Sequence, residues 1–336
     1  MRAVALDFER RALMEREVPA PEIARDDHGL FRVEEVGVCC TDRELASFRL
    51  GYPPEGESIL VLGHEAAGRV IEVGAAATSL RPGDCVVPMI RRGCSPPCPC
   101  CARRRSDLCV SGKYRERGIF GLHGYFCETA VDSERDLVAV PERLAEFAVL
   151  AEPLSVVEKA IQTAMKFREE PPITAGVLGA GPVGLLAAMA LRARGLDVWL
   201  YSLESESHPR ARLVEHLGAR YVKSLDFHAD IVVEATGAAQ AAFAAIRCLT
   251  PLGVCALLGA DTGEGHVSFR DLVVGNRIVF GSVNASPEAF ALAIEDLGRF
   301  DQAMLRKLIE RRPFSAFPES IAAPSSGTAK IAHVIH

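Results

Sequence analysis

The chain has 336 residues, of which 49% are hydrophobic and 24% charged, and its formal net charge is -6. Its length and composition suggest two globular domains, so global disorder and a miniprotein held together by disulfides are both excluded. The acidic balance offers no basic surface for nucleic acid, and the longest apolar run, Val183 to Leu191, is far shorter than the roughly 20 residues that span a bilayer. We therefore expect neither nucleic acid nor a membrane among its partners.

The first residues, MRAVALDFERRALMEREV, carry charges throughout and contain no apolar core of a signal peptide. This pattern predicts a cytoplasmic location, where thiols stay reduced. The 11 cysteines of the chain therefore need a role other than disulfide formation.

An apolar run, FRVEEVGVC, predicts a strand that ends at Cys39. Further along the chain, His64 and Glu65 lie in LGHEAAGRV, and Glu152 lies in LAEPLSVVEKA. A thiolate, an imidazole and a carboxylate around Zn²⁺ leave one position open, which is the pattern of catalytic zinc sites. Each residue also has a simpler interpretation: Cys39 as a small buried apolar residue, His64 as a turn residue and Glu152 as an acid at a helix N-terminus. Spacing alone does not join residues so far apart into one site.

A cluster of cysteines lies in the segment GCSPPCPCCARRRSDLC. Cys94, Cys98, Cys101 and Cys109 form a C-x3-C-x2-C-x7-C ladder. Four thiolates enclose a zinc ion completely, so the ladder predicts a structural site, and the metal would supply the folding free energy of a loop with little apolar content. Reduced thiols that bind no metal are the alternative, and Cys100 is an alternative to Cys101 as the third ligand.

After a Pro-Pro break, the chain reads ITAGVLGAGPVGLLAAMALRARGLDVWLYSLE. A short apolar strand leads into Gly179, Gly181 and Gly184 in a G-x-G-x-x-G pattern, and an apolar helix and a second strand over residues 197–202 follow. These glycines permit the tight turn, the close approach of a pyrophosphate and the packing of helix on strand. The pyrophosphate then meets free N–H groups at the helix N-terminus.

Further apolar strands are expected at residues 231–233, 254–258 and 278–283, with helical stretches between them. Alternating strands and helices predict an α/β Rossmann domain with a doubly wound parallel sheet. A glycine-rich turn in an unrelated α/β domain is the alternative.

The choice between NAD and NADP depends on the end of the second strand, which reads Ser202-Leu203-Glu204. An acid at this place favours the free ribose hydroxyl of NAD, whereas an arginine favours the phosphate of NADP. Glu204 therefore favours NAD, but the neutral Ser202 occupies the more usual acidic position, and Arg210 and Arg212 follow downstream. Both cofactors stay open.

Six segments, in their order and spacing, resemble the zinc-dependent medium-chain dehydrogenases: GVCCTD, LGHEAAGRV, RPGDCVV, the four-cysteine loop, GAGPVG and VEATG. Within that family, RRGC, LAEPLSVVEKA and GSVNAS are most similar to the glucose (aldose) 1-dehydrogenase branch. The resemblance covers essentially the whole chain. It implies a GroES-like β-barrel catalytic domain over residues 1–155, a Rossmann dinucleotide-binding domain over 156–286, and a C-terminal segment over 287–336 that returns to the catalytic domain.

The resemblance also implies roles for single residues. The catalytic zinc ligands fall on Cys39, His64 and Glu152, and Glu65 matches a neighbouring acid that ligates the metal in some states or lies behind it. Thr41 matches the hydroxyl that contacts the substrate oxygen and begins the proton relay. The structural zinc ligands fall on the four cysteines of the ladder, Cys94, Cys98, Cys101 and Cys109.

Glu116 and Asn284 match positions that hold sugar hydroxyls in the aldose branch. Substrate contacts are therefore expected at Thr41, Glu65, Glu116, Glu152 and Asn284. Cofactor contacts are expected at Gly179, Gly181, Pro182, Val183, Gly184, Ser202, Glu204, Thr236 and Asn284.

Three features depart from the family pattern. Cys40 replaces the glycine that usually follows the ligand cysteine, and the cysteine loop carries one extra residue between its first two ligands. Val156 stands where sugar dehydrogenases of this branch can carry an acid that touches the substrate. The last departure bears on which sugar is used more than on the type of reaction.

The activity that the resemblance implies is hydride transfer from the anomeric C1 hydroxyl of a glucose-like aldose to NAD or NADP, which gives a lactone and uses one catalytic and one structural zinc. The first alternative is a zinc dehydrogenase for a polyol, a secondary alcohol or a threonine-like substrate. The second is a non-catalytic dinucleotide-binding protein that responds to zinc or redox state. A homo-oligomer, either dimer or tetramer, is also implied, with the strand over residues 278–283 pairing between subunits.

Overall fold

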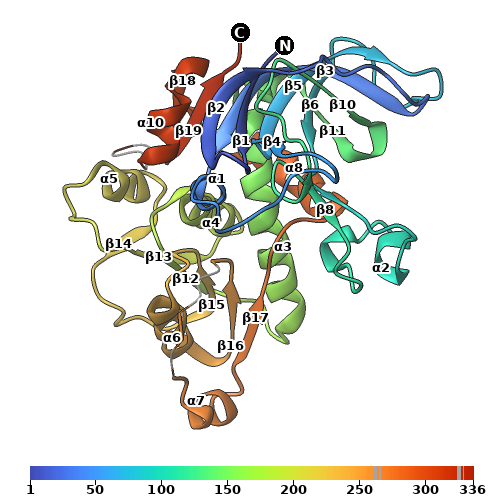
Figure 1. Ribbon diagram of the computed structural model, residues 1–336. Coiled ribbons are helices and arrows are strands. Elements are labelled where there is room, and N and C mark those ends of the chain that lie inside the picture. The colour runs from blue at the N-terminus through green and yellow to red at the C-terminus, as the bar shows by residue number, and fades with distance from the viewer. Residues whose placement is uncertain (260–262, 265, 324–326, 328) are drawn as a thin grey trace.

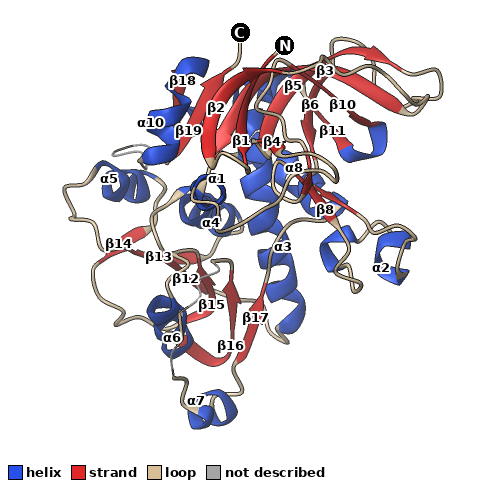
Figure 2. Cartoon of the chain, in the orientation of Figure 1, coloured by secondary structure: helices blue, strands red, loops and turns tan. Residues whose placement is uncertain are grey.

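The computed structural model describes residues 1–259, 263–264, 266–323, 327 and 329–336. Both ends of the chain form one region of largely antiparallel strands, and the middle of the chain forms a second region around a parallel sheet (Figure 1). Helices surround the parallel sheet, whereas the antiparallel region consists mainly of strands and loops (Figure 2). Within the described residues, no helix combines the length and apolar character needed to cross a membrane.

The antiparallel region is organised around β3 (His28–Val38), an 11-residue strand rich in valine. It pairs with β5 along most of its length, with β10 over its first half and with β19 over its second half. Six strands of this seven-stranded sheet follow the order β11-β6-β5-β3-β19-β18, and the seventh, β10, pairs with β3 beside this path. Besides β3, the strands are β5 (Glu65–Val73), β6 (Cys85–Pro88), β10 (Thr129–Ser133), β11 (Leu137–Val140), β18 (Ile309–Pro313) and β19 (Lys330–Val334).

Two smaller sheets complete this region. One has the order β2-β1-β4 and consists of β1 (Arg2–Asp7), β2 (Ala12–Glu17) and β4 (Ile59–Val61). The other has the order β7-β8-β9 and consists of β7 (Arg91–Arg92), β8 (Arg115–Arg117) and β9 (Gly121–Leu122). The core of this region is aromatic at its centre, where Phe31, Tyr125 and Phe126 are each at most 2% exposed.

The parallel sheet has the order β14-β13-β12-β15-β16-β17, and every neighbouring pair in it is parallel. Its strands are β12 (Thr174–Leu178), β13 (Asp197–Tyr201), β14 (Arg220–Val222), β15 (Ala229–Glu234), β16 (Leu249–Leu257) and β17 (Ile278–Gly281). Counted from the first strand, this is the order 3-2-1-4-5-6 of a doubly wound sheet that binds dinucleotides. The predicted doubly wound parallel sheet is confirmed.

Ten α-helices and four 3-10 helices lie in the described residues. The α-helices are α1 (Cys40–Ala46), α2 (Pro99–Ala102), α3 (Ala151–Phe167), α4 (Pro182–Ala193), α5 (Pro209–His216), α6 (Ala239–Arg247), α7 (Phe269–Val274), α8 (Pro287–Arg299), α9 (Gln302–Leu308) and α10 (Phe317–Ala322). The 3-10 helices are η1 (Ser106–Leu108), η2 (Glu134–Asp136), η3 (Glu142–Leu150) and η4 (Phe314–Ala316).

Helix α3 joins the two regions, because it contacts β5 and β6 on one side and α4 and α8 on the other. Its apolar side chains belong to one continuous core that includes Val87 of the antiparallel region and Val177 of the parallel sheet. The expected boundary between residues 155 and 156 lies inside this shared helix. The division of the chain into three parts stays a prediction.

The last predicted strand, over residues 278–283, is shorter in the structure. β17 ends at Gly281, and the chain turns at Asn284, whose φ of 64° lies in the left-handed region. That turn removes residues 282 and 283 from the strand. β17 is the last strand at one side of the parallel sheet.

Candidate active site

Cys39 occupies the N-cap of α1, directly after β3. Its backbone N–H donates to Asp42 Oδ2 at 2.9 Å, and its Sγ accepts from the backbone N–H of Thr41 at 3.2 Å. This reciprocal arrangement is a capping box in which a thiol takes the place of the usual hydroxyl. A hydrogen bond from the Cys40 thiol and the nearby charge of His64 hold the pKa of the Cys39 thiol well below its ordinary value. The surroundings of the cap therefore favour the thiolate form of Cys39 at the end of β3.

His64 directly precedes β5, and its side chain is buried. Its Nε2 lies 3.0 Å from Cys39 Sγ, and its Nδ1 lies 3.4 Å from Asp42 Oδ1, a contact without hydrogen-bond geometry. Burial opposes protonation of His64, but the charges of Cys39 and Asp42 outweigh it and raise the pKa of the imidazole well above its ordinary value. A carboxylate behind an imidazole also orients the ring, as is common for histidines that bind metals.

Glu65 forms a buried ion pair with Lys330 of β19. Lys330 Nζ lies 2.7 Å from Glu65 Oε1 and also contacts Oε2, and the two residues are 1% and 3% exposed. Burial raises the pKa of Glu65, and the charge of Lys330 opposes that rise. A strand from the far end of the chain thus places a cation directly beside the predicted metal site.

The ligand atoms of Cys39, His64 and Glu65 all lie within 4.8 Å of one another. Glu152, in the first turn of α3, stands outside that group, so the structure gathers three of the four predicted catalytic ligands. Burial and then the neighbouring Glu65 carboxylate raise the pKa of Glu152 to about 8. A thiolate and two carboxylates that repel one another in a buried space are a donor set that a divalent cation stabilises. These residues therefore fit a zinc ion.

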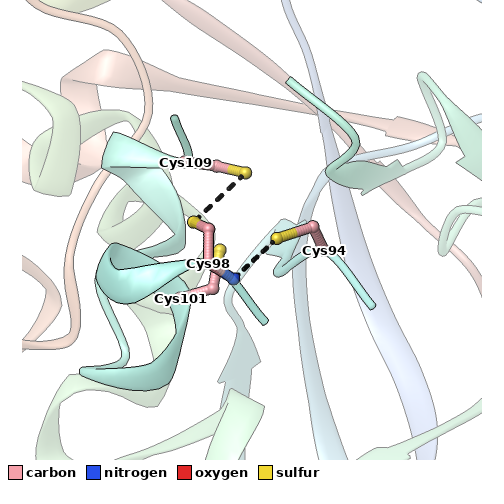
Figure 3. A group of neighbouring side chains, drawn as sticks. All are labelled: Cys94, Cys98, Cys101 and Cys109. Atoms are coloured by element: carbon pink, nitrogen blue, oxygen red, sulfur yellow. Dashed lines mark hydrogen bonds between the residues drawn. The ribbon is translucent and has the colours of Figure 1, made fainter. Parts of the chain in front are cut away.

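The four-cysteine loop brings Cys94, Cys98, Cys101 and Cys109 together, with all four sulfurs within 4.8 Å of one another (Figure 3). Cys98 Sγ lies 3.9 Å from Cys109 Sγ, and Cys94 Sγ accepts a hydrogen bond of 3.1 Å from the Cys98 N–H. A hydrogen bond from the Cys101 N–H lowers the pKa of Cys98 to about 6, whereas burial and the neighbouring thiols raise the pKa of Cys101 to about 12. Four sulfurs at this distance cannot all ionise without a cation between them, so the loop fits a closed zinc site.

Cys100 lies outside this group of sulfurs, although it is adjacent to Cys101 in sequence. Both residues belong to the short helix α2, where neighbouring side chains point in different directions. The geometry therefore favours Cys101 as the third ligand.

The glycine-rich turn between β12 and α4 has the predicted shape. Gly179 has a φ of 105°, in the region that side chains other than glycine rarely adopt. A Cβ on Gly184 would overlap the carbonyl oxygen of Gly179, so the third glycine allows the helix to approach the strand closely. Helix α4 begins at Pro182, which leaves the first N–H groups of the helix free for an anion.

A cavity of about 770 Å³ opens at the carboxyl ends of the parallel strands beside this turn. Five of the predicted cofactor residues line it: Gly179, Gly181, Ser202, Glu204 and Thr236. A neighbouring cleft of about 240 Å³ is lined by Gly181, Pro182, Val183 and Thr236 together with Cys39, Glu65 and Lys330. Gly181 and Thr236 thus border both spaces, and the nucleotide cavity leads to the candidate metal group. Gly184 and Asn284 line neither space.

Cations surround the end of β13, where NAD and NADP differ. Glu204 Oε1 lies 3.1 Å from Arg210 Nη1, and the Ser202 hydroxyl donates to the Glu204 carboxylate. Lys223 Nζ donates to the carbonyl oxygens of Ser202 and Glu204 at 3.0 and 2.6 Å. Glu204, which lines the cavity, is an acid suited to a ribose hydroxyl, and its ion-pair partner Arg210, which lines the neighbouring cleft, is an arginine suited to a phosphate.

Comparison with known proteins identifies the family. The alcohol dehydrogenase GroES-like domain family matches residues 25–142, and the glucose dehydrogenase C-terminus family matches residues 145–333. The glucose 1-dehydrogenase of Thermoproteus tenax is 39% identical over 314 residues, which cover 88% of each chain. Glucose 1-dehydrogenase 2 of Vulcanisaeta moutnovskia is 41% identical over 283 residues, which cover 80% of each chain. This chain belongs to the glucose 1-dehydrogenase family.

A solved structure of the glucose dehydrogenase family extends the likeness to the whole fold. The glucose dehydrogenase of Haloferax mediterranei, in complex with NADP, Zn and gluconolactone, matches with a TM-score of 0.91 and 32% identity, covering 100% of this chain and 99% of that one. The predicted fold class, a Rossmann domain plus a GroES-like catalytic domain, is confirmed.

Within the glucose dehydrogenase family fold, Glu116 and Asn284 lie together although 168 positions separate them in sequence. Asn284 Nδ2 donates to Glu116 Oε1 at 2.9 Å, and Glu116 is buried at 5% exposure. Glu116 comes from β8, and Asn284 comes from the turn after β17. The two predicted sugar contacts therefore form one polar pair between the two regions of the molecule.

Two residues beside the candidate metal group were missed by sequence reasoning. Asp42 supports both Cys39 and His64, and its only signal in the sequence is its place three residues after the N-cap cysteine, where capping boxes carry an acid or amide. Lys330 pairs with Glu65, and its signal is a single charge within the apolar segment AKIAHVI, which predicts a buried strand. A buried lysine in such a strand needs a partner, but the sequence does not say which.

Proposed function

We propose that this chain oxidises an aldose at its anomeric C1 hydroxyl, transfers the hydride to NAD or NADP, and releases a lactone. One observation carries the proposal: Gly181 and Thr236 of the nucleotide cavity also border the cleft that contains Cys39 and Glu65. A relative of 32% identity with this fold holds NADP, Zn and gluconolactone, which are the cofactors and product class of such a reaction.

The proposed ligands of the catalytic zinc are Cys39, His64 and Glu152, with Glu65 as an alternate ligand. When bound there, zinc supplies Lewis acidity, which lowers the pKa of a coordinated hydroxyl. Asp42 holds the imidazole of His64 in orientation. Lys330 fixes the position of the Glu65 carboxylate, because both carboxylate oxygens contact its ammonium group.

Thr41 is the proposed start of the proton path. It lies in the first turn of α1, and its backbone N–H donates to Cys39 Sγ, so its place relative to the metal group is fixed by the same cap. Its hydroxyl would accept the proton of the substrate hydroxyl and pass it toward solvent. The remaining work of the chain is to hold the sugar carbon against the nicotinamide and to exclude water from the buried site.

The proposed sugar contacts are Glu116 and Asn284, with Thr41, Glu65 and Glu152 on the side of the metal. A buried polar group without a partner costs about 1–3 kcal/mol, so a site for a polyhydroxylated substrate needs several acceptors and donors. The pair of Glu116 and Asn284 offers both kinds. Val156 offers none, and it removes one contact that other members of the aldose branch can make, so we expect a different preference among aldoses.

A panel of substrates tests the proposal directly. We expect aldoses to reduce NAD or NADP, followed by absorbance of the reduced nicotinamide, and sorbitol, 2,3-butanediol and L-threonine to react much more slowly. Cys39→Ser and His64→Ala should abolish turnover and leave cofactor binding close to that of the wild type, because neither side chain lines the nucleotide cavity. Faster turnover of a polyol than of any aldose would replace the proposal with a polyol dehydrogenase.

We also propose that the chain forms a homo-oligomer through the exposed edge of β17, as the family resemblance implies. The helix before this strand, α7, exposes Phe269, Val273 and Val274 by 79%, 58% and 70%. Among the described strands, β17 pairs only with β16, and a strand edge left open beside exposed apolar side chains is a surface that a second copy can cover.

A cytoplasmic location is proposed from the state of the thiols. All 11 cysteines lie in the described part of the chain, and none of them forms a disulfide. Thiolates that bind metal need a compartment that keeps them reduced. Recovery of the native protein from a secreted or periplasmic fraction would contradict this location.

A further inference from the structure

A buried salt bridge lies directly behind the proposed sugar contacts. Arg91 of β7 and Glu116 of β8 are opposite one another in the antiparallel pair, and they are 8% and 5% exposed. Arg91 Nε donates to Glu116 Oε1 at 2.7 Å. The guanidinium carbon of Arg91 also lies 3.8 Å from the centroid of the Tyr114 ring. The arginine is therefore held on several sides, and it fixes one oxygen of the carboxylate.

The other end of Arg91 contacts the four-cysteine loop. Its Nη1 donates to the carbonyl oxygen of Asp107 at 3.3 Å, and Asp107 belongs to η1, between the third and fourth cysteines of the ladder. The Ser106 hydroxyl donates to the carbonyl oxygen of Arg91 at 3.1 Å. Two hydrogen bonds therefore connect strand β7 and the loop, and each of the two segments donates one of them.

A second path leads from the loop to the turn that carries Asn284. The Asp107 carboxylate lies 2.9 Å from Lys159 Nζ and 2.8 Å from Arg105 Nη2. Lys159 also donates to the carbonyl oxygen of Val283 at 2.9 Å. Lys159 is part of α3, about two turns beyond Glu152 on the same face of the helix. The Asp107 carboxylate of the loop therefore binds Lys159, and Lys159 in turn binds the turn that carries Asn284.

The two paths converge on one atom, because Glu116 Oε1 accepts from both Arg91 and Asn284. Within the described residues, no hydrogen bond reaches Glu116 Oε2. The protein therefore fixes one oxygen of the carboxylate and leaves the second available to a ligand. An arginine suits this task better than a lysine, since Nε and Nη1 reach two acceptors at once.

We infer that Arg91 is a positioning residue for sugar recognition, and that the four-cysteine loop sets the geometry of the Glu116 and Asn284 pair through Arg91, Asp107 and Lys159. The inference rests on the proposed function, because it assigns Glu116 and Asn284 to the sugar. The loop then has a role in substrate specificity besides its stability. Removal of the guanidinium should weaken sugar binding without changing the chemical step.

Steady-state kinetics of Arg91→Met test the inference. We expect the KM for the preferred aldose to rise about tenfold or more, which corresponds to the loss of one hydrogen bond to a charged group. The kcat should stay within about twofold, and the KM for the dinucleotide and a zinc content of two per chain should not change. Arg103→Met is the matched control, because Arg103 lies in the four-cysteine loop that Arg91 contacts but is exposed, and the variant should behave as the wild type.

A double-mutant cycle with Glu116→Gln separates positioning from a general structural effect. If Arg91 acts through Glu116, Arg91→Met should raise the sugar KM much less in the Glu116→Gln background than in the wild type. An equal rise in both backgrounds, an unchanged KM, or a loss of zinc in Arg91→Met would each overturn the inference. Should Arg91→Met fail to fold, Arg91→Lys keeps the charge but not the two-ended contact, and the same cycle decides with it.

The wild type is assayed first, which separates this inference from the proposed function. If the wild type oxidises no aldose, the proposed function fails and the inference fails with it. If the wild type oxidises aldoses and the Arg91 variants keep the wild-type KM, only the inference fails.

Discussion

At the scale of single residues, the candidate site consists of buried charges that compensate one another only in part. Cys39, Glu65 and Glu152 are acidic groups, and His64 and Lys330 provide positive charge beside them. Burial and then the neighbouring Glu65 carboxylate raise the pKa of Glu152 to about 8, so these two effects outweigh the attraction of His64 and Lys330 for the Glu152 carboxylate. A metal ion at this place would complete the balance, so substitutions here should act differently on the metal-free and the metal-bound protein.

The first prediction concerns Lys330→Met. In the metal-free protein this change leaves Glu65 buried without its partner, so the free energy of unfolding should fall by about 3–5 kcal/mol. Zinc should bind more tightly, because a repelling cation is gone and the Glu65 carboxylate is free. Denaturant unfolding of the metal-free protein and competition for zinc with a chromophoric chelator measure the two effects. Weaker zinc binding by the variant would show that Lys330 supports the metal site and does not compete with it.

The second prediction concerns pH. In the metal-free folded chain Glu152 keeps its proton up to about pH 8, whereas in the unfolded chain it releases the proton near its ordinary value of 4.5. Between these values the folded state binds more protons, so the stability of the wild type should fall as the pH rises. Glu152→Gln lacks this titration, so its free energy of unfolding should rise relative to that of the wild type as the pH increases between these two values. Urea unfolding of both metal-free proteins from about pH 5 to about pH 9 checks this, and a difference that does not vary with pH would contradict it.

Single site residues could be predicted from the sequence where they lie within short motifs. Cys39, His64 and Glu65 lie within motifs, and the structure brings them together. Lys330 was not predicted, because its partner lies 265 positions away and only the pairing of β3 with both β19 and β5 makes them neighbours. Glu152 lies outside the group formed by Cys39, His64 and Glu65, and its role as a ligand stays a prediction.

At the scale of elements, the four-cysteine loop depends on contacts that are not apolar. Its helices α2 and η1 have four and three residues, and Leu108 and Val110 are 47% and 72% exposed. Such short helices are not stable by themselves. The loop is therefore held by its sulfur cluster and by the ionic contacts of Asp107, so it should be sensitive to loss of either.

The third prediction concerns Cys109→Ala. This change removes one ligand of the closed site, so the zinc content should fall from two to one per chain and the melting temperature should fall. Turnover at saturating sugar should persist, because the change leaves the Cys39 group intact. Cys100→Ala is the matched control, since Cys100 is in the same loop but outside the sulfur cluster. Metal analysis and thermal unfolding measure both variants, and equal effects of the two changes would argue against the assigned ligands.

Whole elements were predictable from the sequence where one continuous segment determines them, and not where distant segments must pair. The strand, glycine turn and helix around Gly179 were predictable because one continuous segment determines them. The pairing of β3 with β19 joins residues almost 300 positions apart, and nothing within either segment identifies the other. The end of β17 was predicted two residues too late, because apolar Val283 continues the pattern while the left-handed φ of Asn284 bends the chain.

At the scale of the whole molecule, both regions contribute to the polar pair that is proposed to meet the sugar. Glu116 comes from the antiparallel region and Asn284 from the parallel one, and α3 connects the two. The turn of Asn284 directly follows β17, the strand at the open side of the parallel sheet. A partner subunit that pairs with β17 would therefore also stabilise the position of Asn284.

The fourth prediction tests that partner. In an interface with twofold symmetry each substitution occurs twice, so Val274→Lys places two like charges on one apolar surface. We expect the wild type to sediment as a dimer or larger species and Val274→Lys to shift toward the 36.2 kDa monomer at micromolar concentration. Ile71→Lys, on the exposed side of β5, is the control and should sediment as the wild type.

If Val274→Lys becomes monomeric, the sugar KM should rise as well, because β17 and the turn of Asn284 lose their support. A monomeric wild type would show that the apolar surface of α7 has another role.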